Sequence, residues 1–83
     1  MGFKGGKKME LYEVVPGEYE TPDGENQLRM DLRNGNITGF FEDENERIFN
    51  FKIINNQIKW EIRPQEFEYI EEKIFEYKEY VEG

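Results

Sequence analysis

Tight-turn signals divide most of this 83-residue chain into short segments, and this punctuation constrains the fold more than any other feature. Asn-Gly at 34–35 is the strongest short-range signal for a two-residue β-hairpin, and Asn55-Asn56 is of similar type. Pro16-Gly17, Pro22-Asp23-Gly24 and the acidic stretch 43–46 supply further turns. The segments between these turns have four to eight residues, a length typical of strands.

These short segments alternate between apolar and polar residues, as half-buried strands do. The clearest apolar sets are Leu28, Met30 and Leu32; Phe49, Phe51 and Ile53; and Ile58, Trp60 and Ile62. The predicted strands are 11–15, 18–21, 27–32, 37–42, 47–54 and 57–62. Because they are joined by tight turns, we expect an antiparallel β-meander of five or six strands, strongly twisted, within residues 10–62.

The last part of the chain changes to helical periodicity. Its apolar residues recur at steps of three and four, at Phe67, Ile70, Ile74, Tyr77 and Val81. Pro64 stops the last strand, since proline cannot donate to a sheet ladder, and it suits the first position of a helix. The sequence therefore predicts one α+β domain over residues 9–83, with the sheet at 10–62 and an amphipathic helix at 64–82 packed on it.

The predicted sheet is wider than the predicted helix. Six strands at a spacing of ~4.8 Å make a sheet roughly 29 Å wide, whereas a helix is about 10 Å across. Either the sheet curls around the helix toward a partial barrel, which we favour, or a second copy or a partner covers the rest of the apolar face. The expected core is Leu28, Met30, Leu32, Phe49, Phe51, Ile53, Ile58, Trp60, Phe67, Ile70, Ile74 and Tyr77.

The composition argues against most catalytic and metal chemistry. The chain has no Cys and no His, so disulfides, zinc sites and haem sites are not expected. The acids at 43–46 match a calcium loop poorly, because Arg47 stands at the third ligand position and no Gly follows. No Ser or Cys nucleophile and no phosphate-binding glycine motif occurs. We expect no enzymatic activity, no metal and no cofactor.

The N-terminal residues 1–8 are basic and Gly-rich, and they are predicted to be a disordered tail or a cloning artefact. No run approaches the ~20 apolar residues of a membrane span, and no secretory signal is recognisable. Ile, Lys, Asn, Phe, Tyr and Met supply 37 of 83 positions, which suggests an AT-rich genome. We therefore expect a cytoplasmic protein of a low-GC bacterium, encoded by the bacterium, a phage or a plasmid.

The net charge of −8 is the reverse of that of most nucleic-acid-binding domains, so direct binding to nucleic acid is not expected. Phe49 and Phe51, flanked by Arg47 and Lys52, could form a stacking platform for a single strand. Their spacing of two residues also places both rings on one face with Ile53. Core packing explains the two phenylalanines without a nucleic-acid ligand.

The polar side of the helix is acidic, with glutamates at 68, 72, 76 and 79. Like charges four residues apart, and acids near a helix C-terminus, are each unfavourable by a few tenths of a kcal/mol. An acidic face can serve solubility and nothing more. Carboxylates roughly 6 Å apart along a helix also approximate the phosphates of a nucleic-acid strand, and could occupy a groove lined by Lys and Arg.

These observations lead to the hypothesis of a non-enzymatic acidic protein that occupies a basic surface of a nucleic-acid-handling partner. Small acidic inhibitors made by phages and mobile elements have this general character, and an anti-CRISPR protein is the concrete form. The expected contact residues are Glu68, Glu72, Glu76 and Glu79, with Asp43, Glu44 and Glu46 as a second acidic patch. The alternatives are an assembly module that forms a homodimer through its sheet and, third, a single-strand binder.

Overall fold

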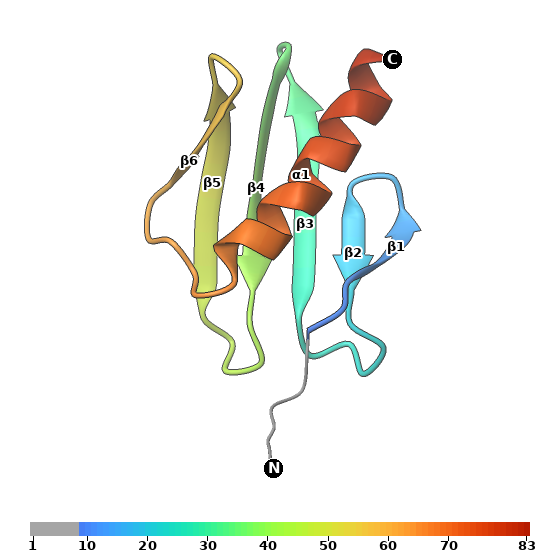
Figure 1. Ribbon diagram of the computed structural model, residues 1–83, viewed down its shortest axis with the longest axis vertical. Helices are drawn as coiled ribbons and strands as arrows, with labels where there is room; N and C mark the ends of the chain where they lie inside the picture. The colour runs from blue at the N-terminus through green and yellow to red at the C-terminus, as the bar shows by residue number, and fades with distance from the viewer. Residues whose placement is uncertain (1–8) are drawn as a thin grey trace.

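Six antiparallel strands and one C-terminal helix make up the part of the chain that the computed structural model describes, residues 9–83 (Figure 1). The predicted tail at residues 1–8 lies outside the described residues. The elements are β1 (Tyr12–Val15), β2 (Glu18–Glu20), β3 (Gln27–Arg33), β4 (Asn36–Glu42), β5 (Ile48–Ile54), β6 (Gln57–Trp60) and α1 (Phe67–Glu82). The predicted α+β class and the order of its elements are confirmed.

The strands are hydrogen-bonded in sequence order, as a meander requires. Asn34 and Gly35 have φ values of 53° and 80°, and Asn55 and Asn56 have φ values of 53° and 65°. These left-handed conformations are those of the two-residue turns that match the twist of a hairpin. The two turns therefore fix the β3–β4 and β5–β6 registers, which pair Leu32 with Ile37 and Ile53 with Ile58.

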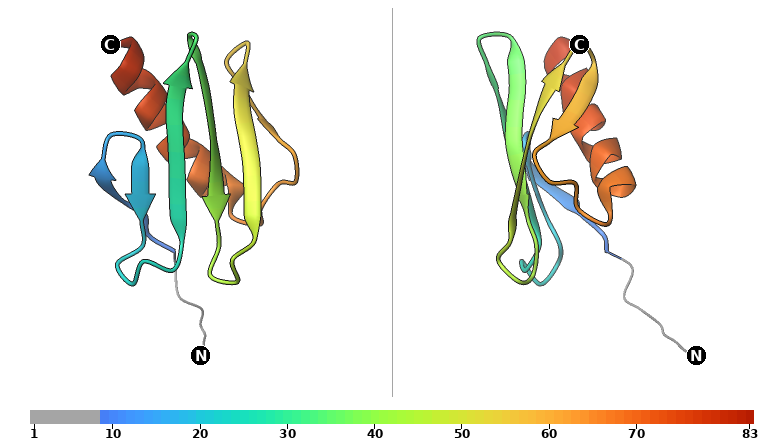
Figure 2. Two further views of the ribbon diagram at one scale, coloured as in Figure 1. Left: turned by 180° about the vertical axis from the view of Figure 1, so that it is seen from behind. Right: turned by 90° about the vertical axis from the view of Figure 1, so that its left-hand side faces the viewer.

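The helix crosses one face of the sheet diagonally, from the ends of β4 and β5 toward the opposite end of β3 (Figure 1). Seen along the sheet, β6 and the segment that enters β1 bend toward the helix (Figure 2). The sheet stays open, with β1 and β6 as its two edges. The two sides of the sheet therefore bend toward the helix, but the sheet stays open and does not form the expected partial barrel.

The core lies between the helix and the sheet face that it crosses. Its buried side chains are Leu11, Tyr19, Leu28, Met30, Ile37, Phe41, Phe51, Ile53, Ile70, Ile74 and Tyr77. Phe49, Ile58 and Trp60 are partly buried against this core. The indole N–H of Trp60 donates to the Glu71 carboxylate at 2.9 Å, which links β6 to α1. Of the twelve expected core residues, seven are buried, and Phe67 is only half-buried and does not belong to the core cluster. Four buried residues, Leu11, Tyr19, Ile37 and Phe41, were not expected.

Leu32, expected in the core, and Ile62, placed with Ile58 and Trp60 on the core-facing side of the last predicted strand, are both exposed, so these predictions are wrong. Leu32 is 46% exposed, because it lies near the tip of the β3–β4 hairpin, beside the last turn of α1. Ile62 is 70% exposed. The last strand ends at Trp60, and the chain then bends, so the two-residue alternation no longer determines where Ile62 points.

The helix begins later than predicted, at Phe67 instead of Pro64. Pro64 is buried, and residues 65–66 form a turn that carries the chain from β6 across the sheet. The first intrahelical hydrogen bond runs from the N–H of Ile70 to the carbonyl of Glu66. The proline therefore anchors the connection and does not start the helix.

Within residues 9–83 no helix has the length and apolar character needed to span a membrane.

Candidate interaction surface on the acidic helix

All four predicted glutamates of the helix are exposed on the side that faces away from the sheet. Ile70, Ile74 and Tyr77 are the buried residues of α1, and they lie on its opposite side. We call Glu68, Glu72, Glu76 and Glu79 the acidic ridge. Because successive glutamates are three or four residues apart, the ridge follows the helix along most of its length.

Most of the charge on the acidic ridge is uncompensated. Glu68, Glu72 and Glu79 make no side-chain hydrogen bond or ion pair within residues 9–83. Glu76 accepts hydrogen bonds from the Tyr19 hydroxyl and from the Lys73 ammonium, each at 3.4 Å. The last turn of the helix contains no basic residue. The ridge therefore presents three unpaired carboxylates to solvent.

An aromatic residue that the sequence reasoning overlooked accompanies the acidic ridge. Phe75 is 37% exposed, and it stands three residues after Glu72 and four before Glu79, so the three side chains share one side of α1. Tyr80, 64% exposed, stacks on Tyr77 with ring centroids 6.3 Å apart. Aromatic residues are enriched among the residues that contribute most to protein interfaces. The spacing of three and four residues between Phe75 and the glutamates could have predicted its place on this side of the helix.

The loop between β4 and β5 uses one of its three predicted acids for its own structure. The Asp43 carboxylate accepts the N–H groups of Asn45 and Arg47 at 2.9 Å, and pairs with the Arg47 guanidinium at 3.0 Å. Burial acts to raise the pKa of Asp43, but the two backbone hydrogen bonds and Arg47 outweigh it and lower the pKa below its ordinary value. Glu44 and Glu46 are exposed. Asp43 therefore stabilises the conformation of the loop, and Glu44 and Glu46 present their charges to solvent.

The structure brings Asp43 and Glu44 together with acids that no sequence pattern connected to them. A cleft of about 610 Å³ lies between the β2–β3 loop, the β4–β5 loop, the segment before β1 and the turn before α1. Its acidic lining residues are Glu10, Asp23, Glu25, Asp43, Glu44 and Glu66. We call this feature the acidic cleft. Glu46 does not line it.

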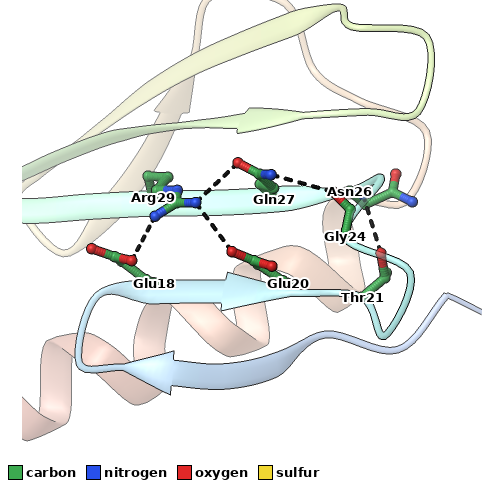
Figure 3. Close-up of polar contacts among 7 residues, drawn as sticks. All are labelled: Glu18, Glu20, Thr21, Gly24, Asn26, Gln27 and Arg29. Atoms are coloured by element: carbon green, nitrogen blue, oxygen red, sulfur yellow. Dashed lines mark hydrogen bonds and ion pairs between the residues drawn. The ribbon is translucent and has the colours of Figure 1, made fainter.

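The face of the sheet opposite the helix is different, because basic residues offset its acids. Arg29 on β3 pairs with Glu18 and Glu20 on the neighbouring strand β2, and its guanidinium donates a further hydrogen bond to the Gln27 amide oxygen at 3.0 Å (Figure 3). The Gln27 amide in turn donates to the Gly24 carbonyl at 3.2 Å. This network ties the β2–β3 loop to the strands. Within residues 9–83, the acidic ridge and the rim of the cleft therefore hold six of the glutamates that lack a side-chain partner, Glu25, Glu44, Glu66, Glu68, Glu72 and Glu79, whereas Glu13, Glu42 and Glu46 lie elsewhere.

No side-chain group with the composition and geometry to hold a metal ion occurs among residues 9–83. No protein-family model matches the chain, and comparisons with curated proteins and with solved structures give no significant match.

Proposed function

We propose that this protein is a non-enzymatic acidic binding protein that occupies a basic surface of a nucleic-acid-handling protein. The observation that carries the proposal is the acidic ridge, an exposed row in which Glu68, Glu72 and Glu79 lack partners within the described chain. A stability-driven sequence would place Lys or Arg near these carboxylates and in the last helical turn. The helix instead places glutamates at these positions, against local stability, and such departures are expected where a surface serves binding.

The ridge has the dimensions that a basic groove would accept. Successive carboxylates rise roughly 6 Å per four residues along the helix axis, and the helix is narrow enough to enter a groove that holds a nucleic-acid strand. Phe75 adds a partly exposed ring between Glu72 and Glu79. Such a surface would combine long-range attraction with a short-range apolar contact. An inhibitor of a CRISPR effector, carried by a phage or plasmid, is the concrete form that we propose.

Affinity capture tests the proposal most broadly. The immobilised full chain is incubated with lysate of a low-GC bacterium at low salt, and retained proteins are eluted with a short duplex or single-stranded oligonucleotide. The proposal predicts retained proteins that bind nucleic acid and that the oligonucleotide displaces. It also predicts weaker retention as salt rises, because exposed charges are screened within about 10 Å at 0.1 M salt. Retention that neither salt nor oligonucleotide changes would contradict it.

A second candidate, a module that associates through its sheet, is supported by exposed apolar residues on two of its strands. Tyr12, Val14 and Val15 on the edge strand β1 are 47–56% exposed, as is Ile48 on β5, at 48%. A stable dimer formed by these residues would survive high salt, since apolar association does not depend on ion pairs. Light scattering over a range of protein and salt concentrations distinguishes the candidates, because the acidic-binder proposal predicts a constant monomer mass.

A further inference from the structure

The acidic cleft combines a negatively charged rim with an apolar floor. Phe49 and Met9 are half-buried and line the cleft together with the buried Pro64 and Phe41, whereas Glu25, Glu44 and Glu66 of its lining are exposed. The volume of about 610 Å³ falls within the roughly 300–1,000 Å³ of typical ligand sites. The cleft is therefore large enough for a side chain and adjoining backbone of another molecule.

Three carboxylates of the rim are available to a ligand. Glu25, Glu44 and Glu66 are exposed, and none of them makes a side-chain hydrogen bond or ion pair within residues 9–83. They come from the β2–β3 loop, the β4–β5 loop and the turn before α1, so the charges surround the cleft from three sides. No three acids in the described chain are arranged to hold a metal ion. The rim therefore suits an extended cation better than a point charge.

Arginine fits this combination of surfaces. Its aliphatic stem packs on apolar surface, while its planar guanidinium stacks on rings and binds carboxylates through two hydrogen bonds. Two guanidinium contacts at this end of the molecule illustrate the chemistry. Arg47 pairs with Asp43 in the wall of the cleft, and the Arg63 guanidinium lies 4.2 Å from the centre of the Phe67 ring.

We propose that the acidic cleft receives an arginine side chain on an extended basic segment of the protein partner. This inference rests on the proposed function, and it adds a second contact at the end of the sheet where α1 begins (Figure 1). The acidic ridge supplies a row of charges along a groove, whereas the cleft accepts one inserted side chain. The two contacts together would fix the direction in which the partner lies along the helix.

Nuclear magnetic resonance titration of the full chain with acetyl-Gly-Arg-Gly-amide tests the cleft directly. The matched control peptide carries citrulline, which has the shape of arginine without its charge. The expected result is shift changes in amides of the loops 21–26 and 43–47 and the turn 64–66, with binding of the citrulline peptide weaker by roughly tenfold, since charge-assisted hydrogen bonds are the stronger ones. Equal binding of both peptides, or shifts confined to the helix, would overturn the proposal.

Two triple variants of the full chain separate the cleft from general electrostatics. Glu25→Gln/Glu44→Gln/Glu66→Gln removes three rim charges, and Glu68→Gln/Glu72→Gln/Glu79→Gln removes three ridge charges, all from exposed acids. The rim variant should weaken peptide binding by about tenfold and the ridge variant by less than about twofold, because exposed charges act mainly at short range in salt. Similar weakening by both variants would overturn the inference.

Lys4, Lys7 and Lys8 directly precede Met9 in the sequence, so the titration also tests these basic residues as the alternative ligand of the cleft. If the peptide binds the cleft only after Lys4→Gln/Lys7→Gln/Lys8→Gln, the tail is the natural occupant and the proposal is overturned. The proposed function fails separately, when capture of a nucleic-acid-binding partner does not depend on the acidic ridge. Ridge-dependent capture that is unaffected by the rim variant would overturn only the cleft.

Discussion

The hydroxyl of Tyr19 on β2 donates a hydrogen bond to the carboxylate of Glu76 on α1, across 57 residues of sequence. Tyr19 is 4% exposed, so its ring belongs to the core while its hydroxyl reaches the edge of the acidic ridge. Glu76 also contacts Lys73 at 3.4 Å. The contact therefore joins β2 to α1 beside the acidic ridge, while the buried Ile70, Ile74 and Tyr77 turn the remaining ridge glutamates away from the sheet.

Tyr19 should make the stability of the protein fall at high pH. Burial, with the negative charges of Glu76 and Glu13, raises the pKa of Tyr19 from 10.0 to about 12. The unfolded chain then loses the proton first, so the free energy of unfolding should decrease as the pH rises from about 10 toward about 12. Urea unfolding across this range should show a smaller decrease for Tyr19→Phe. Equal decreases in the two proteins would contradict this role of Tyr19.

Asp43 should have the opposite effect, in acid. The pKa of Asp43 is lowered from its ordinary value of 3.8, so its ionised form stabilises the fold above that pH and the benefit is lost as the pH falls below it. Asp43→Asn keeps an oxygen acceptor but removes the charge. The melting temperature of the variant should be lower than that of the original at neutral pH, with the gap narrowing in acid. A gap independent of pH would show that charge does not matter at this position.

Glu46 occupies a left-handed conformation, with φ at 64°. This conformation costs a residue with a side chain about 1 kcal/mol, whereas glycine adopts it freely. Glu46→Gly should therefore raise the free energy of unfolding by about 0.5–1 kcal/mol. Glu44→Gly, in the same loop without a positive φ, is the matched control and should lower it. Chemical denaturation measures both changes, and destabilisation by Glu46→Gly would contradict the prediction.

Gly39 is required where β4 passes between β3 and β5. A Cβ atom at this position would lie 2.2 Å from the Arg29 carbonyl oxygen and 2.7 Å from the Met30 Cβ. Because backbone must move to relieve these contacts, Gly39→Ala should lower the free energy of unfolding by roughly 1–3 kcal/mol or more. Gly39→Ala that unfolds at the same urea concentration as the original would contradict the close approach of the strands.

Much of the fold is encoded locally, and the parts that sequence reasoning missed depend on the relative positions of distant elements. The Asn34-Gly35 and Asn55-Asn56 turns could be predicted because each acts within two residues. The burial of Phe41 could not, since the apolar neighbours Phe40 and Phe41 leave the inward face of β4 ambiguous. Leu32 lies on the predicted face of β3, but near the tip of the hairpin only the last turn of α1 is close to it, so its side chain stays exposed.

The candidate site likewise has one part that the sequence predicts and one part that it does not. The acidic ridge was predictable, because helical spacing alone brings its glutamates onto one side of α1. The acidic cleft was not, because Glu25, Glu44 and Glu66 belong to three separate segments that only the folded sheet brings together. The role of Asp43 was also hidden, since its hydrogen bonds depend on the conformation of its loop.

Charge reversal of the acidic ridge tests whether this surface binds a basic, nucleic-acid-handling partner, as we propose. Glu68→Lys/Glu72→Lys/Glu79→Lys is compared in the affinity capture with Asp31→Lys/Glu42→Lys/Glu61→Lys, which makes the same change in net charge on the opposite face of the sheet. Both variants should fold, as checked by circular dichroism. The ridge variant should lose the oligonucleotide-displaced partner, and the sheet variant should retain it. Capture of the same partner by both variants would show that the acidic ridge does not bind it.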